Sequence, residues 1–276
     1  MDYTFGVVPT SAIVGMALSG LVSLCVPIAL LTIWKKKTNA KISTFFIGCG
    51  TFIVFALIIE SIFHQIILGH LFPSMTENIW IYALYGGFMA GLFEETGRFV
   101  SMKFLMKKNF NKENGIMYGI GHGGIEAILI VTLSEVSNIA TSFAVNSGAI
   151  NMIMSSLPES EAGPLYEQLS SLWTMHPSIF YAAGLERMSA ITLHIGLSYL
   201  VYIAVKDRKI VNYLLAVFAH MFVDAITVIM SNKGVNTWIM EVILALMVAA
   251  FMVYVVIDYK KRNESETLVD SYYFSQ

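Results

Sequence analysis

Residues 211–230 read VNYLLAVFAHMFVDAITVIM, a stretch long enough to cross the hydrocarbon core of a bilayer, which takes about 20 apolar residues. It contains His220 and Asp224, which are four residues apart and therefore share one face of a helix. An ionisable side chain inside an apolar segment is costly, so it is usually buried, paired and functional. This one stretch predicts both a transmembrane helix and a polar site inside it.

The rest of the chain has the same character. Of its 276 residues 56% are hydrophobic and 13% charged, against about 25% charged in soluble domains. We expect an all-α polytopic membrane protein with one integral domain, residues 1–262, a motif-bearing core at about 80–230 and a short polar tail, 263–276. The net charge of −2 predicts no nucleic-acid partner. The seven apolar windows that we expect to span the bilayer are 8–34, 43–68, 80–106, 115–142, 178–205, 211–230 and 238–259.

Basic residues predict how these seven helices are oriented. Clusters of lysine and arginine follow the first, third, fifth and seventh windows, all on one side, and the other side carries only Lys233. Positive residues favour the cytoplasm, so we expect the N-terminus outside and the C-terminus cytoplasmic. The clusters are Lys35, Lys36, Lys37 and Lys41; Lys103, Lys107, Lys108 and Lys112; Lys206, Arg208 and Lys209; and Lys260, Lys261 and Arg262.

Two further patterns concern packing. The outer loop, about 145–177, has apolar residues at helical spacing, which predicts an amphipathic helix on the membrane surface. Glycines recur every four residues on the third and fourth windows, which predicts that these two helices pack closely. The loop residues are Leu165, Leu169, Leu172 and Trp173, and the glycines are Gly87 and Gly91, then Gly115, Gly119 and Gly123.

Polar side chains gather at a similar depth on four of the windows. With a helical rise of 1.5 Å per residue, they lie roughly 10–19 Å from the cytoplasmic ends. Histidine with carboxylate can form an acid/base pair or a metal site, so shared depth predicts one site. The residues are Glu94 and Glu95 on the third window, His122 and Glu126 on the fourth, His194 on the fifth, and His220 and Asp224 on the sixth.

Spacing predicts local roles for these groups. Arg98, four residues after Glu94, can hold one glutamate ionised, while the other glutamate serves as general base; which one is the base stays open. Asp224 can accept a proton from one nitrogen of His220 and leave the other nitrogen free. We expect the small residues flanking His122 to leave room beside its ring for a water or a substrate backbone; these are Gly121, Gly123 and Gly124.

A second polar set is predicted for the outer half of the helices. We interpret it as a structural network or a water-filled vestibule in which Arg187 pairs with one of the acids, because an unpaired charge there is unfavourable. Glu126 is expected to support His122. The members of this outer set are Glu60, His64, Glu135, Glu186 and Arg187.

Three motifs resemble the CAAX-protease and bacteriocin-processing superfamily, and within it the YhfC branch of intramembrane metalloproteases. They are Glu94-Glu95-Thr96-Gly97-Arg98, Tyr118-Gly119-Ile120-Gly121-His122 and His220-Met221-Phe222-Val223-Asp224. The chain departs from the superfamily pattern in two places: Arg98 follows the glutamates after two residues instead of three, and Tyr118 replaces the usual phenylalanine. The resemblance covers about half the chain and implies a bacterial cell-membrane protein.

The resemblance also implies roles. Glu94 or Glu95 would activate a water with His122, and His220 with Asp224 would stabilise the oxyanion or help to hold a metal. Three imidazoles and one carboxylate suit zinc, while a metal-free glutamate mechanism stays open. The metal set would be His122, His194, His220 and Glu94.

These observations favour an intramembrane endopeptidase whose substrate is a peptide or protein embedded in the bilayer. Two alternatives use the same residues differently. A proton- or metal-coupled transporter would use them as a relay, and a non-catalytic assembly subunit would use His194 and His220 to hold partner helices. The sequence leaves the substrate and the oligomeric state open.

Overall fold

The computed structural model describes residues 3–274, with side chains as far as Asn263, and this part of the chain is helical without a strand. Several helices continue through short π-helical turns, which are Ile53–Glu60, Ile67–Leu71, Ser101–Leu105 and Ile128–Thr132. The α-helices are α1 (Thr10–Lys37), α2 (Ile42–Phe52), α3 (Ser61–Ile66), α4 (Ile79–Val100), α5 (Lys112–Ala127), α6 (Leu133–Asn146), α7 (Ile150–Ser156), α8 (Glu159–Thr174), α9 (Ser178–Asp207), α10 (Ile210–Asn232) and α11 (Thr237–Phe274).

Six helices in the described part are long and apolar enough to cross a membrane. They correspond to all the expected windows except the third, which is α4. That helix has 22 residues but holds Glu94, Glu95 and Arg98, and these charges lower its hydropathy. The six are Thr10–Lys37, Ile42–Leu71, Lys112–Asn146, Ser178–Asp207, Ile210–Asn232 and Thr237–Asn263.

The chain divides into two compact units. Unit 1 comprises the chain up to Val26 together with Glu126–Met188, and unit 2 comprises Pro27–Ile125 and the chain from Ser189 onward. Helix α11 continues past Asn263 through the expected polar tail to Phe274.

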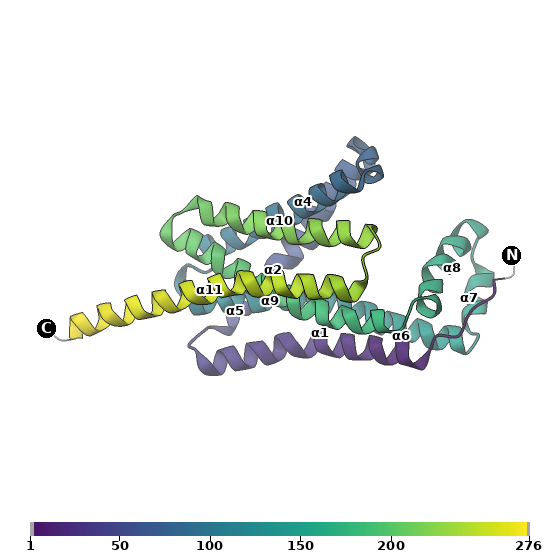
Figure 1. Ribbon diagram of the computed structural model, residues 1–276, viewed down its shortest axis with the longest axis horizontal. Coiled ribbons are helices and arrows are strands. Elements are labelled where there is room, and N and C mark those ends of the chain that lie inside the picture. Colours follow the sequence, from purple (N-terminus) through teal and green to yellow (C-terminus); the bar gives the residue numbers. More distant parts are fainter. Residues whose placement is uncertain (1–2, 275–276) are drawn as a thin grey trace. The chain divides into compact units, whose positions relative to one another are not determined.

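In unit 2, α4 and α10 lie side by side (Figure 1). Gly87 and Gly91 make this contact possible, because a Cβ added to them would lie 2.5 Å from the carbonyl oxygen of Met221 and 2.6 Å from that of Val217. The glycine face of α4 thus packs on α10. The prediction that the helices of the third and fourth windows pack closely on each other stays a prediction.

The glycines of α5 pack against two other helices of unit 2. A Cβ on Gly119 would lie 2.8 Å from the Cα of Ile195 on α9, and one on Gly121 would lie 2.0 Å from the carbonyl oxygen of Phe45 on α2. Gly48 of α2 makes the reciprocal contact, 2.2 Å from the carbonyl oxygen of Tyr118. Helix α5 is thus fixed between α2 and α9 by direct contacts of backbone.

Unit 1 has a separate core, built by α7 and α8 with the start of α1, the end of α6, the start of α9 and the segment before α1. Val8 donates its N–H to Asn146 at 2.8 Å and accepts from the same side chain at 3.0 Å, which ties the N-terminal segment to the end of α6. The expected amphipathic helix is present as α8, but Leu169 and Leu172 are buried in this core, with Leu165 and Trp173 against it. Its apolar face is therefore covered by the protein, and its placement on a membrane surface is not borne out.

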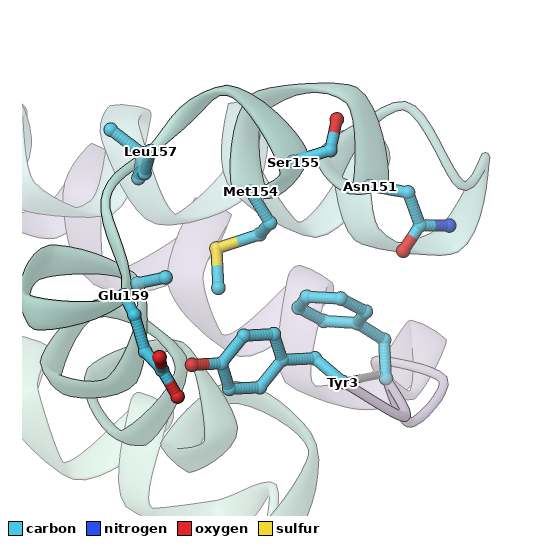
Figure 2. Close-up of a pocket in the computed structure, with 8 residues that line it drawn as sticks. Tyr3, Asn151, Met154, Ser155, Leu157 and Glu159 are labelled. Carbon is cyan, nitrogen blue, oxygen red and sulfur yellow. The ribbon is translucent and has the colours of Figure 1, made fainter. Parts of the chain in front are cut away.

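A pocket of about 430 Å³ opens in unit 1 (Figure 2). Tyr3, Met154 and Glu159 contribute to its wall, together with other residues of α7 and of the segment before α1. It holds none of the side chains that the motifs single out. The polar groups predicted to converge belong instead to unit 2, except Glu126, which belongs to unit 1.

Candidate active site

Helix α4 supplies the acidic half of the site. Asn78 caps its N-terminus by accepting the N–H groups of Trp80 and Ile81 at 3.0 and 3.3 Å, which fixes where the helix begins. Near its C-terminal end the helix carries Glu94, which is 6% exposed, and Glu95 and Arg98, which are both 0% exposed. Burial of three charges on adjacent turns requires that they compensate one another.

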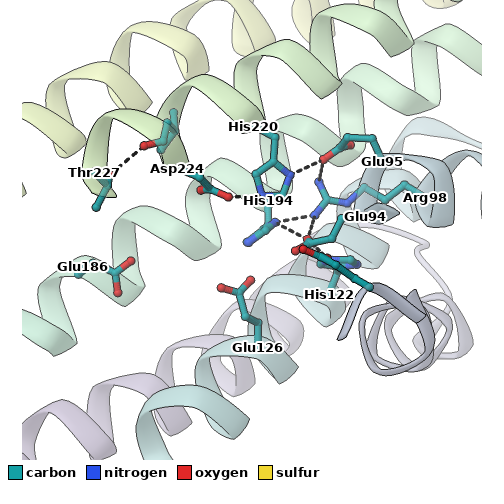
Figure 3. Close-up of polar contacts among 12 residues, drawn as sticks. Glu94, Glu95, Arg98, His122, Glu126, Glu186, His194, His220, Asp224 and Thr227 are labelled. Carbon is teal, nitrogen blue, oxygen red and sulfur yellow. Dashed lines mark hydrogen bonds and ion pairs between the residues drawn. The ribbon is translucent and has the colours of Figure 1, made fainter. Parts of the chain in front are cut away.

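Glu94 lies between two histidines from other helices (Figure 3). Nε2 of His122, on α5, is 2.8 Å from Oε2 of Glu94, and Nδ1 of His194, on α9, is 3.9 Å from the same oxygen. The rings of the two histidines have centroids 5.2 Å apart. The prediction that these residues meet is confirmed by the geometry of unit 2, and Glu94 is the carboxylate at their centre.

Arg98 connects the two glutamates. Its Nη2 donates to Oε2 of Glu94 at 3.2 Å and to Nδ1 of His194 at 2.5 Å, while its Nη1 donates to Oε1 of Glu95 at 2.9 Å. We expected Arg98 to hold one glutamate and leave the other to a water. It holds both, because the guanidinium fork presents parallel donors to carboxylates that lie three and four residues earlier on the same helix.

Glu95 and His220 form a second pair, on the other side of Arg98 (Figure 3). Nδ1 of His220 donates to Oε1 of Glu95 at 2.9 Å, and Nε2 of His220 lies 3.5 Å from Oδ2 of Asp224. The predicted pairing of His220 with Asp224 is present, but the other ring nitrogen is not left free as expected, since Glu95 takes it. His220 therefore stands between two carboxylates, of which Glu95 is buried and Asp224 has a side chain 37% exposed.

Close packing positions the ring of His122. It contacts Phe52 edge-on, with centroids 5.3 Å apart, and Tyr118 one turn earlier at 6.0 Å. The expectation that the neighbouring glycines leave open space is wrong, because each faces a neighbouring helix. A Cβ added to Gly121 would lie 2.0 Å from Phe45, one added to Gly123 would lie 2.9 Å from His194, and one added to Gly124 would lie 2.6 Å from Pro27.

The group Glu94, His122 and His194 has the composition of a metal site. Each offers one ligand atom, these atoms lie within 4.8 Å of one another, and all three residues are buried. Two imidazoles and a carboxylate are a three-ligand set found in catalytic zinc sites. The residues fit a metal by chemistry and proximity. His220, the fourth expected ligand, is not in this group.

The remaining predicted residues fall into separate contacts. In unit 2, Nε2 of His64 is 3.1 Å from Oε1 of Glu60 and its Nδ1 is 3.0 Å from the hydroxyl of Tyr85, a residue that no sequence pattern singles out. In unit 1, Arg187 binds Glu126 at 2.8 Å and also Glu186, as the prediction of an acid partner for Arg187 requires.

Glu135 and Glu126 have partners of their own in unit 1. Oε2 of Glu135 accepts from the side-chain amide of Asn138 at 3.0 Å. Glu126 lies on the same helix as His122, and its carboxylate forms an ion pair with Arg187. Its expected support of His122 stays a prediction.

Comparison with known proteins now adds to this geometry. A family model described as YhfC intramembrane metalloprotease matches residues 22–244, a range that includes every residue of the site. An uncharacterized membrane protein YhfC from Bacillus subtilis (strain 168) is 37% identical over 262 residues, which cover 92% of this chain and 98% of that protein. No solved structure matches.

The six apolar helices and the bacterial relative make this an integral membrane protein of the bacterial cell membrane. The match to the family model covers well over half of the chain and agrees with the buried Glu94, His122 and His194. The chain belongs to the YhfC intramembrane metalloprotease family.

Proposed function

We propose that the protein is an intramembrane endopeptidase, which hydrolyses a peptide bond in or next to a membrane segment of its substrate. One observation carries the proposal: Oε2 of Glu94 accepts from Nε2 of His122 at 2.8 Å inside a buried cluster of unit 2. A carboxylate and an imidazole in contact can share the proton of an attacking water. The family description of a metalloprotease supports the same chemistry.

Glu94 is the base in this proposal, and Glu95 is not. Oε1 of Glu95 already accepts from both Arg98 and His220, and Glu95 is fully buried. Glu94 meets His122 and lies near His194, which places its carboxylate where a reacting water could contact several polar groups at once. Glu95 then has a different role, which is to hold Arg98 and His220 in place.

His220 and Arg98 supply positive charge for the reaction. His220 donates to Glu95 and faces Asp224, so it can carry a proton between two carboxylates. Arg98 donates toward Glu94 and His194. Such fixed donors stabilise the negative charge that develops on the carbonyl oxygen of a tetrahedral intermediate.

Glu94, His122 and His194 are the residues that would hold a metal, zinc being the ion that suits them best. Zinc, when bound, would polarise the substrate carbonyl and make a coordinated water more acidic. In the metal-free version Glu94 and His122 take the proton of the water, whereas with a metal bound they would serve as its ligands. Burial and orientation by the surrounding residues are common to both versions.

Catalysis inside the bilayer requires α4 to be a membrane helix as well. We propose that α4 is the seventh span, with the N-terminus outside and the C-terminus cytoplasmic. Its 22 residues match the length of a span, and its charges pair with one another and with histidines of neighbouring helices. The four basic clusters then lie together on the cytoplasmic side.

The test is cleavage of membrane proteins by the purified protein in lipid nanodiscs. Bacterial membrane fractions are incubated with the wild type, and new peptide termini are identified by terminal-amine mass spectrometry. Glu94→Gln and His122→Gln should each lower the yield of these termini by at least about 100-fold, as expected for losing a proton-transfer group. Glu135→Gln is the matched control, because Glu135 is also a buried carboxylate but is bonded to Asn138.

The control variant should retain wild-type cleavage. Wild-type rates in Glu94→Gln would overturn the proposal, as would new termini that appear equally with all variants.

A further inference from the structure

An apolar groove lies at the basic end of unit 2, and none of its lining residues belongs to the candidate active site. It has a volume of about 480 Å³, within the range of about 300–1,000 Å³ typical of small-molecule sites. Its walls come from α1, α5, α9 and α11 and are mostly apolar. Residues in the wall include Ile33, Ile116, Ile195, Met252 and Val256.

The groove continues into a polar pocket at its basic end. Tyr259 and Asn263 line both cavities, so the two are adjacent. The polar pocket has about 440 Å³ and adds Lys37 to the wall, while Lys260 lies at the mouth of the apolar groove. An apolar channel thus opens onto two lysines.

Aromatic residues mark this junction as the level of the membrane interface. Trp34 donates its ring N–H to the carbonyl oxygen of Glu113 at 2.9 Å and contacts the ring of Tyr259, with centroids 6.4 Å apart. Nζ of Lys112 lies 5.7 Å from the centre of the same tyrosine ring. Tryptophan and tyrosine concentrate where lipid headgroups meet the hydrocarbon.

The charge of the lining residues indicates what kind of molecule the groove can bind. Lys37 and Lys260 are exposed, and the carboxylate lining the polar pocket, Glu113, already accepts from the hydroxyl of Tyr259 at 3.4 Å. The lining therefore presents a net positive charge to a headgroup while the aliphatic wall faces an acyl chain. A peptide segment would leave its backbone groups unbonded along that wall.

We propose that this groove is a binding site for one anionic phospholipid, with an acyl chain between α1 and α11 and the phosphate near Lys37 and Lys260. The proposal does not depend on the proposed proteolysis, because the groove shares no residue with the active site.

Native mass spectrometry of the full-length protein tests it. The probes are phosphatidylglycerol and phosphatidylcholine with identical oleoyl chains, and glycerol 1-phosphate as a headgroup without chains. Wild type should bind phosphatidylglycerol at least about fivefold more tightly than phosphatidylcholine, since a lysine near an anionic headgroup contributes about that factor. Lys260→Gln should lose most of this preference, and Lys108→Gln, an exposed lysine at the same end that does not line the groove, should keep it.

A second pair of variants tests the acyl channel. Val256→Trp fills the groove from an exposed position, while Val253→Trp places the same side chain at an exposed position of α11 outside it. Only Val256→Trp should weaken lipid binding, and it should raise the apparent Kd at least about tenfold. Any one of four results would overturn the proposal. These are equal affinity of the wild type for the two lipids, a loss of preference in Lys108→Gln as large as in Lys260→Gln, wild-type lipid binding by Val256→Trp, and competition by glycerol 1-phosphate as strong as that by the intact lipid.

Discussion

Replacing Gly121 by alanine should separate two helices that the active site needs in contact. The new Cβ would lie 2.0 Å from the carbonyl oxygen of Phe45, whereas ordinary contacts begin at 3.4 Å. The shortfall is about 1.4 Å, and both partners are backbone, so no side chain can rotate to relieve it. Either α2 or α5 has to move.

The size of the effect follows from overpacking, which costs roughly 1–3 kcal/mol. At roughly 2–4 °C per kcal/mol for a chain of this size, the melting temperature should fall by roughly 2–12 °C. Displacing α5 by about 1 Å also moves His122 relative to Glu94, and a displacement of that size can lower a catalytic rate by about 100-fold.

Gly50→Ala and Gly86→Ala are the matched controls, because an added Cβ at either position has nothing within 4 Å. Thermal unfolding is followed in the same detergent by tryptophan fluorescence and size-exclusion chromatography. The controls should unfold at or above the wild-type temperature, since alanine favours a helix over glycine. A Gly121→Ala protein as stable as Gly50→Ala would show that α2 and α5 are not in backbone contact.

The remaining predictions concern the polar cluster. Glu94→Gln and His194→Gln should each lower zinc affinity by at least about 100-fold in equilibrium dialysis with elemental analysis, a larger loss than outer hydrogen-bond partners usually give, and Glu135→Gln should not. His220→Gln should leave zinc affinity within about 10-fold of wild type, because His220 bonds Glu95 and stands outside the ligand group; loss as large as for His194→Gln would contradict this. Arg98→Gln should cost roughly 3–5 kcal/mol by leaving two buried carboxylates without their cation, whereas Arg262→Gln, at an ion pair with partly exposed side chains, should cost under about 1 kcal/mol by urea or thermal unfolding; equal losses would refute the burial argument.

The sequence was sufficient to predict several of the side chains that meet in unit 2. Glu94, His122, His194 and His220 stand inside apolar windows, and the cost of isolated charges in such windows already requires partners. Helical spacing likewise predicts the pair of Arg98 with Glu94 and that of His220 with Asp224. These contacts follow from depth and periodicity, which a sequence states directly.

Which helices pack against each other could not be predicted in the same way. A run of small residues says that a helix is approached closely but not by which neighbour, and Gly87 and Gly91 turned out to face α10. The expectation that Arg98 bonds only one glutamate was wrong for a different reason: spacing allows a bond to either glutamate, and the side-chain conformation that lets the guanidinium reach both is not stated by the sequence. The packing of α4 on α10 then brings Glu95, and not a water, to His220.

Arg98 also engages one ring nitrogen of His194. Its Nη2 donates to both Glu94 and Nδ1 of His194, so the guanidinium lies beside two of the three candidate metal ligands. A carboxylate has about four lone-pair sites and can serve Arg98 and a second partner together, but each imidazole nitrogen has one lone pair. While Arg98 donates to Nδ1, that nitrogen has no lone pair left for a metal. The arginine of the motif is therefore a positioning residue: it neutralises the two glutamates of α4 and, through one hydrogen bond, fixes the orientation of the His194 ring.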